Sequence, residues 1–312
     1  MNIKHYQLII LGSGPAGCTA AIYAARANLN LAMITGLEKG GQLVKTQQIA
    51  NWPGEFTGVS GFDLMEKMIK QVQSLNVDII CDSIEKVRLS TPPFYLQSKT
   101  QQYTCDTLII AVGVSARLLG LSSEQKYLGK GVSTCAVCDG FFLKNKEVVV
   151  VGGGNVAVEN SLFLSKIAKT VTIIHRRDSF HADEWQVNFI RRISNIKFEL
   201  NSVVTEIFGD DTGVNGIEVQ NVISNVKKLL KIDGIFIAIG HKPNTEIFAG
   251  QLIMNQGYIK IGYSLNAATS VAGVFAAGDV VTNSYKQAIV AASSGCIAAL
   301  DVKTFLNSTK NT

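Results

Sequence analysis

A near repeat within the chain restricts the possible folds more than any other feature of the sequence. The segments LIILGSGPAG at 8–17 and VVVVGGGNVA at 148–157 each contain an apolar run, a glycine-rich turn and the start of an alanine-containing helix. A second apolar run follows each of them, LAMIT at 31–35 and TVTIIH at 170–175. Because dinucleotide-binding folds are built from a strand, a helix and a second strand in this order, the sequence predicts two nucleotide-binding modules.

The order of the motifs places one module inside the other. The runs TLIIAVG and GIFIAIG end at Gly113 and Gly240, and each predicts a parallel strand that closes its module. The segment HKPN then interrupts the chain, and VFAAGDV, followed by a helix of small residues, predicts a return to the first module. We therefore expect an α/β protein with two Rossmann-like domains, the second inserted into the first. The first domain comprises 1–114 and 244–312, and the second comprises 115–243.

The size, charge and apolar runs of the chain argue against several classes of protein. Its 312 residues exceed the usual size of one domain, in agreement with two modules. A net charge of +5 is mild for this length, and Lys and Arg are scattered except at two Arg pairs, so we expect no nucleic-acid partner. The first residues show no secretory signal pattern, and the longest apolar runs are much shorter than a membrane span. We expect a cytoplasmic protein with no membrane association.

The first glycine-rich turn has the spacing and context of a nucleotide-binding site. Gly12, Gly14 and Gly17 follow a predicted strand and open a helix. Gly12 permits the tight turn, Gly14 lets the backbone approach a pyrophosphate, and Gly17 lets the helix pack on the sheet with its N-terminus toward the negative charge. Thr35 and Gly36 stand where an acid would bind a ribose, so the ligand need not be NAD. A glycine turn without a ligand is the alternative.

The second turn is followed by basic residues. It reads GGGNVA, with Ala157 at the third glycine position, a replacement that the dinucleotide pattern tolerates. Arg176 and Arg177 come directly after the next predicted strand, where an NAD-binding protein has an acid. Two guanidinium groups at this place suit the 2′-phosphate of NADPH through charge-assisted hydrogen bonds. An exposed basic pair without a ligand is the alternative.

One pair among the six cysteines predicts redox chemistry. Cys135 and Cys138 are separated by two residues, and a CxxC pair can form a disulfide and exchange it with another thiol. Zinc is a competing interpretation, but the sequence has neither a second CxxC nor an HxxxH pair. Asp139 follows directly and is either a general acid and base or a turn residue. We expect the other cysteines to be isolated thiols, namely Cys18, Cys81, Cys105 and Cys296.

A flavin would connect the nucleotide modules with the cysteine pair. NADPH donates a hydride, whereas a disulfide accepts two electrons, and direct transfer between them is chemically poor. We therefore expect FAD in the first module, NADPH in the second, and electron transfer from NADPH through FAD to the disulfide. Asp279 is a candidate for binding the ribityl hydroxyls, and the helix that begins near Lys286 would direct its N-terminus at the reduced flavin.

Taken together, the motifs resemble those of the low-molecular-weight bacterial thioredoxin reductases along nearly the whole chain. The matching segments are GSGPAG, TGLEKGGQL, NWPGEF, CAVCDGFF, VVGGGNVAVEN, HRRDSF, AIGHKPNT, GVFAAGDV and KQAIVAASSGCIAALD. The resemblance implies a homodimer that reduces thioredoxin, in which the NADPH domain rotates to bring the disulfide and the nicotinamide alternately to the flavin. It also implies that Cys138 lies next to the flavin, that Cys135 attacks the partner protein and that Asp139 donates a proton.

The resemblance also assigns cofactor contacts to individual residues. Those implied for FAD are Gly12, Gly14, Pro15, Ala16, Thr35, Gly36, Gly41, Gln42, Asn51, Asp279, Lys286, Gln287 and Ala288. Those implied for NADPH are Gly154, Asn155, Val156, His175, Arg176, Arg177 and His181. The chain departs from the family pattern at Val112, where Thr is usual, and at Lys286 and His181, where Arg is usual. Lys286 keeps the positive charge but lacks the planar fork of a guanidinium group.

Two other kinds of function fit parts of the same pattern. A related enzyme would reduce a different dithiol protein, or run in reverse as a small-molecule dithiol oxidase, although an oxidase would not need the paired Arg176 and Arg177. A flavin-binding regulatory protein would be reduced by NADPH without passing electrons to any disulfide. Turnover with thioredoxin and with other acceptors separates these functions.

Overall fold

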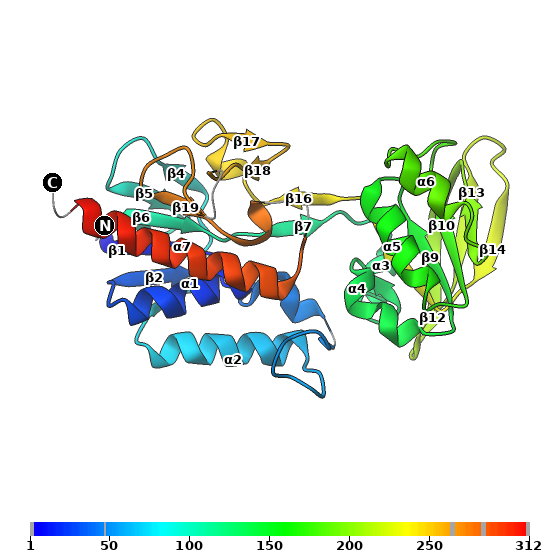
Figure 1. Ribbon diagram of the computed structural model, residues 1–312, viewed down its shortest axis with the longest axis horizontal. Coiled ribbons are helices and arrows are strands. Elements are labelled where there is room, and N and C mark those ends of the chain that lie inside the picture. The colour runs from blue at the N-terminus through cyan, green and yellow to red at the C-terminus, as the bar shows by residue number, and fades with distance from the viewer. Residues whose placement is uncertain (1–2, 47, 263–265, 282–284, 310–312) are drawn as a thin grey trace. The chain divides into compact units, whose positions relative to one another are not determined.

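The chain forms two compact units, which the computed structural model describes for residues 3–46, 48–262, 266–281 and 285–309 (Figure 1). Unit 1 comprises Met1–Ser115 and Lys242–Thr312, and unit 2 comprises Ala116–His241. These boundaries lie one and two residues from the limits at 114 and 243 that the sequence suggested. The two segments at which the chain passes from one unit to the other, β7 (Val114–Ala116) and β16 (His241–Pro243), pair as a two-stranded sheet.

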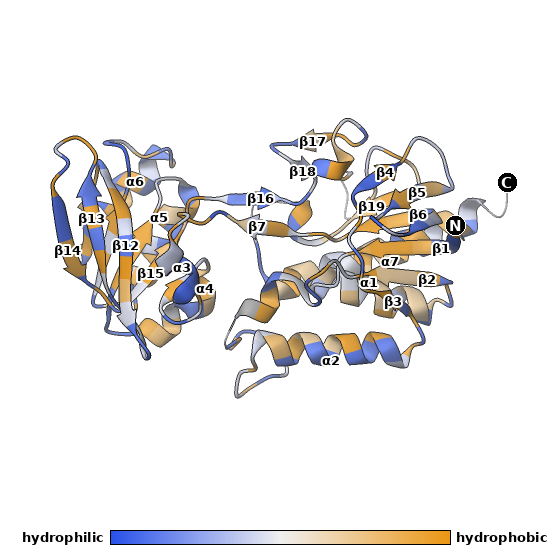
Figure 2. Cartoon of the chain, turned by 180° about the vertical axis from the view of Figure 1, so that it is seen from behind, coloured by the Kyte–Doolittle hydropathy of each residue, from blue (hydrophilic) through white to orange (hydrophobic). Residues whose placement is uncertain are grey.

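Unit 1 is built on a seven-stranded sheet with the order β3-β2-β1-β6-β5-β4, in which β19 also pairs with β6. The strands are β1 (Lys4–Leu11), β2 (Leu31–Ile34), β3 (Asp78–Ile80), β4 (Lys86–Arg88), β5 (Phe94–Gln97), β6 (Gln102–Ile110) and β19 (Val274–Ala276). The pairs among β1, β2, β3, β6 and β19 are parallel, whereas β4, β5 and β6 form an antiparallel meander. The C-terminal halves of β1 and β6 are covered on both faces, which explains why they are continuous apolar runs (Figure 2).

Helices cover one face of this sheet. The helices of unit 1 are α1 (Pro15–Arg26), α2 (Gly61–Ser74) and α7 (Ala288–Thr309), with the 3-10 turns η1 (Gly41–Lys45), η3 (Glu246–Phe248) and η4 (Gly278–Val280). Leu8, Ile10 and Met33 pack against these three helices, whereas Ile9 and Leu11 point to the other face, toward β5 and η3. A small hairpin of β17 (Met254–Asn255) and β18 (Tyr258–Ile259) adds Ile259 to that second core.

Helix α7 is long and apolar enough to cross a membrane, but it packs within unit 1. It lies along α1, and its buried residues belong to the same core as Leu8 and Ile10 of β1. The two helices approach closely, because a Cβ atom on Gly295 would lie 2.1 Å from the carbonyl oxygen of Ala16. The small residues of α7 are therefore explained by close helix packing in a protein core.

Unit 2 repeats the parallel sheet on a smaller scale, with the order β11-β10-β9-β15-β8. Its strands are β8 (Val132–Ser133), β9 (Glu147–Val151), β10 (Thr170–Ile174), β11 (Ile196–Glu199) and β15 (Gly234–Ile237), with a separate antiparallel sheet of β12 (Ser202–Asp210), β13 (Gly213–Asn221) and β14 (Lys227–Lys231). The helices are α3 (Ser122–Lys126), α4 (Ala136–Asp139), α5 (Asn155–Ser165) and α6 (Glu184–Ile190), and the 3-10 turn η2 (Gly140–Leu143) follows α4.

The internal repeat predicted from the sequence is confirmed by the strand pairing. Strand β1 lies between β2 and β6, and β9 lies between β10 and β15 in the same parallel arrangement. The match extends to single hydrogen bonds, because the N–H of Gly12 donates to Ile34 O (2.8 Å) and the N–H of Gly152 donates to Ile174 O (3.0 Å). Strand β8 pairs with β15 as β19 pairs with β6, so the segments that follow β8 and β19 occupy equivalent places in the two units.

We predict that Gly295→Ala destabilises the protein although alanine favours helices. The added methyl group would meet the backbone of α1, at a cost of about 1–3 kcal/mol that exceeds the helical gain of up to about 1 kcal/mol. The measurement is the midpoint of urea unfolding followed by circular dichroism. Ser293→Ala, at an exposed position of the same helix, is the control and should leave the midpoint nearly unchanged. Equal or greater stability of Gly295→Ala would contradict the close approach of α1 and α7.

Candidate functional site

In the glycine-rich turn of unit 1, two glycines have no space for a side chain, and a third has free space around it. A Cβ atom on Gly12 would lie 2.2 Å from Ala111 O, and one on Gly17 would lie 2.0 Å from Gly12 O. Within the described part of the chain, no atom lies within 4 Å of a hypothetical Cβ on Gly14, which caps α1 without a side-chain hydrogen bond. The turn therefore packs tightly on the sheet side and leaves its outer side, at the N-terminus of α1, open to an anionic ligand.

The loop after β2 folds back onto this turn through Ser13. The buried Ser13 hydroxyl donates to Thr35 O (3.2 Å) and accepts a hydrogen bond from the Gly40 N–H (2.9 Å). Gly41 comes so close that its hypothetical Cβ lies 3.4 Å from Gly14 Cα. Thr35 and Gly41, both predicted to contact FAD, are thus brought beside the glycine turn, with Gly36 next to Thr35 in the same loop.

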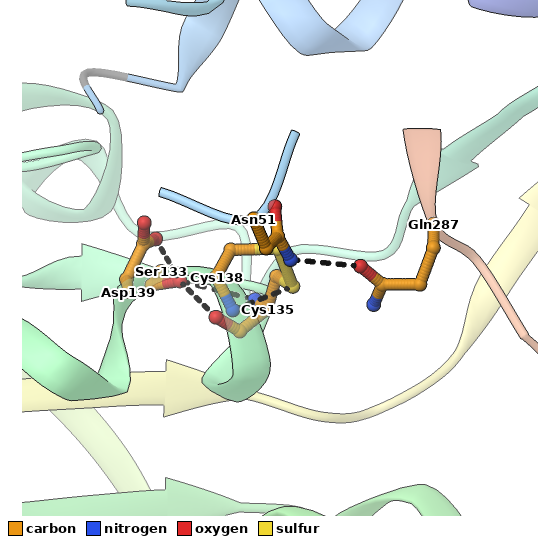
Figure 3. Close-up of a disulfide and its surroundings, with 6 residues drawn as sticks. All are labelled: Asn51, Ser133, Cys135, Cys138, Asp139 and Gln287. Carbon is orange, nitrogen blue, oxygen red and sulfur yellow. Dashed lines mark hydrogen bonds between the residues drawn. A yellow bond between two sulfur atoms is a disulfide. The ribbon is translucent and has the colours of Figure 1, made fainter. Parts of the chain in front are cut away.

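A second group of predicted FAD residues lies around η4 and the start of α7. Burial raises the pKa of Asp279, and the nearby Lys286 partly offsets this rise. Burial likewise lowers the pKa of Lys286, whose ammonium lies 5.2 Å from the centre of the Tyr258 ring. The Asn51 amide donates to the Gln287 side chain (3.3 Å) (Figure 3). The remaining predicted FAD residues also belong to unit 1, namely Pro15 and Ala16 in α1, Gln42 in η1 and Ala288 in α7.

In the glycine turn of unit 2, a histidine ring packs against the second glycine. A Cβ atom on Gly152 would lie 2.3 Å from Ala238 O, as at Gly12, and one on Gly153 would lie 2.2 Å from the His175 ring. No atom of the described residues lies within 4 Å of a hypothetical Cβ on Gly154, which caps α5 without a side-chain hydrogen bond. As in unit 1, the inner glycines are required by packing, and the outer glycine is open at the start of a helix.

His175, predicted to contact NADPH, has a structural role in the turn. His175 is buried, its ring stacks on Phe180 (5.5 Å between centroids), and its Nε2 is 3.1 Å from Ser179 O. Burial lowers the pKa of His175, and the neighbouring Arg176, Arg177 and His181 lower it further, which favours the neutral ring. His175 therefore supports the shape of the turn and of the loop that follows β10.

The basic loop after β10 is tied to the glycine turn at two points. The His181 N–H donates to Gly153 O (2.7 Å), and the Asp183 N–H donates to the Asn155 side chain (2.9 Å). The Asn155 amide donates in return to the Asp183 carboxylate (3.3 Å). The exposed guanidinium of Arg177 contacts Nε2 of His181, which agrees with a shared role of these two predicted NADPH residues. Arg176, shortly after the end of β10, and Val156, in the first turn of α5, are also exposed.

Cys135 and Cys138 form a disulfide at the start of α4 (Figure 3). Their Cα atoms are 5.3 Å apart, and the Cys138 N–H donates to the Cys135 sulfur (3.3 Å). Of the other cysteines, Cys18 and Cys105 are buried, and burial raises the pKa of Cys18 to about 12. Within the described part of the chain, no three His, Cys, Asp or Glu side chains are grouped so as to hold a metal ion.

Asp139 is held beside the disulfide by Ser133, a residue that the sequence reasoning missed. The Ser133 hydroxyl donates to Asp139 Oδ2 (2.5 Å) and accepts a hydrogen bond from the Cys135 N–H (3.0 Å) (Figure 3). Burial raises the pKa of Asp139, and the Ser133 hydrogen bond partly offsets this rise. A carboxyl with a raised pKa next to a disulfide is suited to proton transfer.

The other positioning residues missed from the sequence are Ser13, Tyr258 and Asp183. Ser13 lies within the glycine motif, where its small polar side chain could have indicated a hydrogen bond to a neighbouring loop. No sequence signal marks Tyr258, because it approaches Lys286 only in the folded unit. Asp183 precedes α6 as a helix N-cap candidate, although its side chain bonds Asn155 and does not cap its own helix.

Comparisons with known proteins agree with this arrangement of sites. The family model described as pyridine nucleotide-disulphide oxidoreductase matches residues 6–295. A thioredoxin reductase of Coxiella burnetii is 53% identical over 98% of each chain. A Pseudomonas fluorescens protein named glucosaminate ammonia-lyase is 49% identical over 100% of this chain and 99% of its own. The solved structure of thioredoxin reductase from Giardia duodenalis has a TM-score of 0.93 at 38% identity, covering 97% of this chain and 99% of its own.

These matches confirm the family resemblance and the fold that the sequence predicted. They extend over both units, because the family model and the relatives cover nearly the whole chain. The two glycine turns and the disulfide therefore belong to a fold with two Rossmann-like domains.

We predict that Gly153→Ala destabilises unit 2 through His175. The new methyl group would overlap the imidazole ring, and the overlap should cost about 1–3 kcal/mol. Because the clash is with one side chain, Gly153→Ala should cost much less in a His175→Ala background. A double-mutant cycle on the urea-unfolding free energy measures this coupling. Additive costs of the two substitutions would show that the ring does not support the turn.

Proposed function

Because the chain belongs to the pyridine nucleotide-disulphide oxidoreductase family, we propose that it is a thioredoxin reductase that uses FAD and NADPH. The observation that carries the proposal is the Cys135–Cys138 disulfide in the unit with the basic nucleotide loop. In the net reaction, NADPH and one proton convert the disulfide of thioredoxin into two thiols and yield NADP⁺. The hydride supplies both electrons and one of the two protons.

Unit 1 has the features required of the FAD site. The outer side of Gly14 is open and no described side chain caps α1, so backbone N–H groups and the helix dipole are available to a pyrophosphate. Asp279 and Lys286 offer a carboxylate for hydroxyl groups and a cation for an anionic group. FAD, when bound, accepts a hydride from NADPH and delivers two electrons to the disulfide.

Unit 2 has the features required of the NADPH site. Gly154, Asn155 and Val156 begin α5, where the pyrophosphate would lie. The exposed Arg176 and Arg177 at the end of β10 would bind the 2′-phosphate, together with His181. The hydrogen bonds from His181 to Gly153 and from Asp183 to Asn155 tie the basic loop to this helix start, so the two proposed phosphate sites lie in hydrogen-bonded segments of one unit.

The disulfide and Asp139 carry the thiol chemistry. We assign Cys138 to the flavin side and Cys135 to attack on the partner disulfide. Once the Cys135–Cys138 disulfide has been reduced, the Cys135 thiolate attacks the partner disulfide, forms a mixed disulfide and releases one partner sulfur, which takes a proton from Asp139; Asp139 then regains a proton from water. Cys138 then attacks Cys135, restores the internal disulfide and releases the second partner sulfur as a thiolate that is protonated from water.

An exposed apolar group beside the disulfide suits docking of a protein substrate. The side chains of Phe141 and Phe142, in η2, are 67% and 45% exposed, and Val137 lies exposed between the two cysteines. Exposed aromatic side chains next to a reactive group are characteristic of recognition surfaces. We assign this group, Val137, Phe141 and Phe142, to contact with thioredoxin.

The proposal extends to the assembly and location of the protein. We propose a homodimer, supported by exposed apolar side chains on the neighbouring helices α1 and α7, namely Tyr23, Ile289, Val290 and Leu300. We also propose that the protein acts in the cytoplasm, where thiols are kept reduced.

The relative named glucosaminate ammonia-lyase supplies a second function to test. Elimination of ammonia transfers no electrons from NADPH, so it would use neither the disulfide nor the basic loop of this chain. The deciding experiment is anaerobic reduction with NADPH, addition of oxidised thioredoxin and observation of flavin reoxidation. A parallel assay for ammonia release from glucosaminate tests the alternative. Release of ammonia without thioredoxin-dependent NADPH oxidation would overturn the proposal.

We predict that Cys135→Ser and Cys138→Ser each abolish thioredoxin reduction. Both variants should keep FAD and should still be bleached by NADPH, because the nucleotide turns do not include the disulfide. The measurements are NADPH oxidation with thioredoxin and flavin absorbance with NADPH alone. Cys81→Ser, at an exposed cysteine outside the disulfide, is the control and should be active. Near-normal thioredoxin reduction in either single variant would disprove the proposed electron path.

We predict that Arg177→Ala lowers the efficiency with NADPH and has little effect on NADH. A charge-assisted hydrogen bond contributes about 1.5–3 kcal/mol, so kcat/KM for NADPH should fall about tenfold to a hundredfold. NADH lacks the 2′-phosphate and serves as the internal control. Arg191→Ala, in the basic pair that follows α6, is the matched variant and should change neither coenzyme. Equal losses with NADPH and NADH would assign Arg177 a structural role.

A further inference from the structure

The Ser133 side chain connects the two ends of the redox segment. Ser133 is the last residue of β8 and is only 7% exposed. Its hydroxyl donates to Asp139, at the end of α4, and accepts from the N–H of Cys135, at the beginning of that turn (Figure 3). One buried hydroxyl thus bonds both the acid and the backbone of a disulfide cysteine.

The direction of these hydrogen bonds determines their effect on Asp139. A hydroxyl that donates to a carboxyl oxygen stabilises the ionised form, so the hydrogen bond from Ser133 lowers the pKa of Asp139. Burial acts in the opposite sense and is the larger influence. Ser133 therefore opposes the effect of burial on the same carboxyl.

Few other charges face Asp139. Strand β8 and turn η2 carry no ionisable side chain, and α5, which packs on α4, carries only the exposed Glu159. Lys144 and Lys166 directly follow η2 and α5, and neither these lysines nor Glu159 shifts the pKa of Asp139. Among the described residues, Ser133 is the side chain that bonds and tunes this acid.

We propose that Ser133 is a positioning residue that holds Asp139 beside Cys135 and sets the pH range in which Asp139 can donate its proton. This inference rests on the proposed function, in which Asp139 protonates the departing partner sulfur. Among the described residues Ser133 bonds no sulfur atom, and it acts through Asp139 and the Cys135 backbone. Its link to Cys135 also keeps the acid and the attacking cysteine in one hydrogen-bonded group.

The sign of the expected pH effect follows from the role of Asp139. A general acid acts only while protonated, so the rate falls as pH rises through its pKa. Removing the Ser133 hydroxyl removes a bond to the ionised form, so the pKa of Asp139 should rise and the alkaline fall should move to higher pH. Ser133→Ala should therefore be less active than the parent at neutral pH, because Asp139 is held less firmly. At alkaline pH the variant should keep a larger fraction of its own neutral activity than the parent does.

The experiment compares kcat with saturating thioredoxin in the complete flavoprotein between about pH 6 and pH 9. We expect the ratio of kcat at the alkaline end to kcat at neutral pH to be about threefold to tenfold higher in Ser133→Ala than in the parent. Ser133→Thr keeps the hydroxyl and should restore the parent profile. Thr134→Ala removes the neighbouring hydroxyl, which forms no hydrogen bond to Asp139 among the described residues, and should also keep the parent profile.

A second measurement does not depend on turnover. The infrared band of the protonated Asp139 carboxyl, identified by its loss in Asp139→Asn, should persist to higher pH in Ser133→Ala. Flavin bleaching by NADPH alone should be unchanged in this variant and shows that it is folded. The role of Ser133 would be overturned if the infrared band of Ser133→Ala were lost at the same pH as in the parent. It would also be overturned if the alkaline fall in kcat, shown to arise from Asp139 by its loss in Asp139→Asn, occurred at the same pH in Ser133→Ala and the parent. Either result would leave the proposed function intact. Absence of thioredoxin reduction by the parent would instead overturn the proposed function.

Discussion

The rest of the structure depends on the close approach of a glycine to the backbone that follows a central strand. Gly12 lies against Ala111 and Gly152 against Ala238, with space in neither case for a side chain. This contact starts α1 and α5 directly at the carboxyl ends of their parallel sheets, so each helix N-terminus faces outward beside an open glycine. Two anion-binding positions therefore result from one packing constraint that occurs twice in the chain.

The two units differ in what surrounds this shared element, and those differences separate their chemistry. In unit 1 the loop after β2 closes onto the turn through Ser13, and the half-buried Asp279 and Lys286 lie near the start of α7. In unit 2 the His175 ring fills the space beneath Gly153 and supports an exposed basic loop. The redox segment follows β8, the counterpart of the strand that leads to Asp279 in unit 1. The same scaffold thus presents a disulfide where its other copy presents a carboxylate.

Much of this arrangement could be predicted because it depends on local patterns. Apolar runs, glycine spacing and the basic pair after β10 are read within a few residues, and they predicted the repeat, the inserted unit and the family, all of which are confirmed. The family resemblance implied that His175 is a coenzyme contact, and this stays a prediction; the structure adds that the buried residue packs its ring against Phe180 and Gly153. A histidine after a strand has the same sequence signal whether it binds a ligand or packs.

The sequence by itself determined the class of fold, the two nucleotide turns and the pair of cysteines, because strand periodicity, glycine spacing and CxxC spacing act over short distances along the chain. Only the tertiary structure decided which polar groups meet. Ser133 reaches Asp139 because β8 ends where α4 begins its turn, and Tyr258 reaches Lys286 from a hairpin 28 residues earlier in the chain. Such contacts join single side chains from separate elements, and they form when strand order and helix packing bring those elements together.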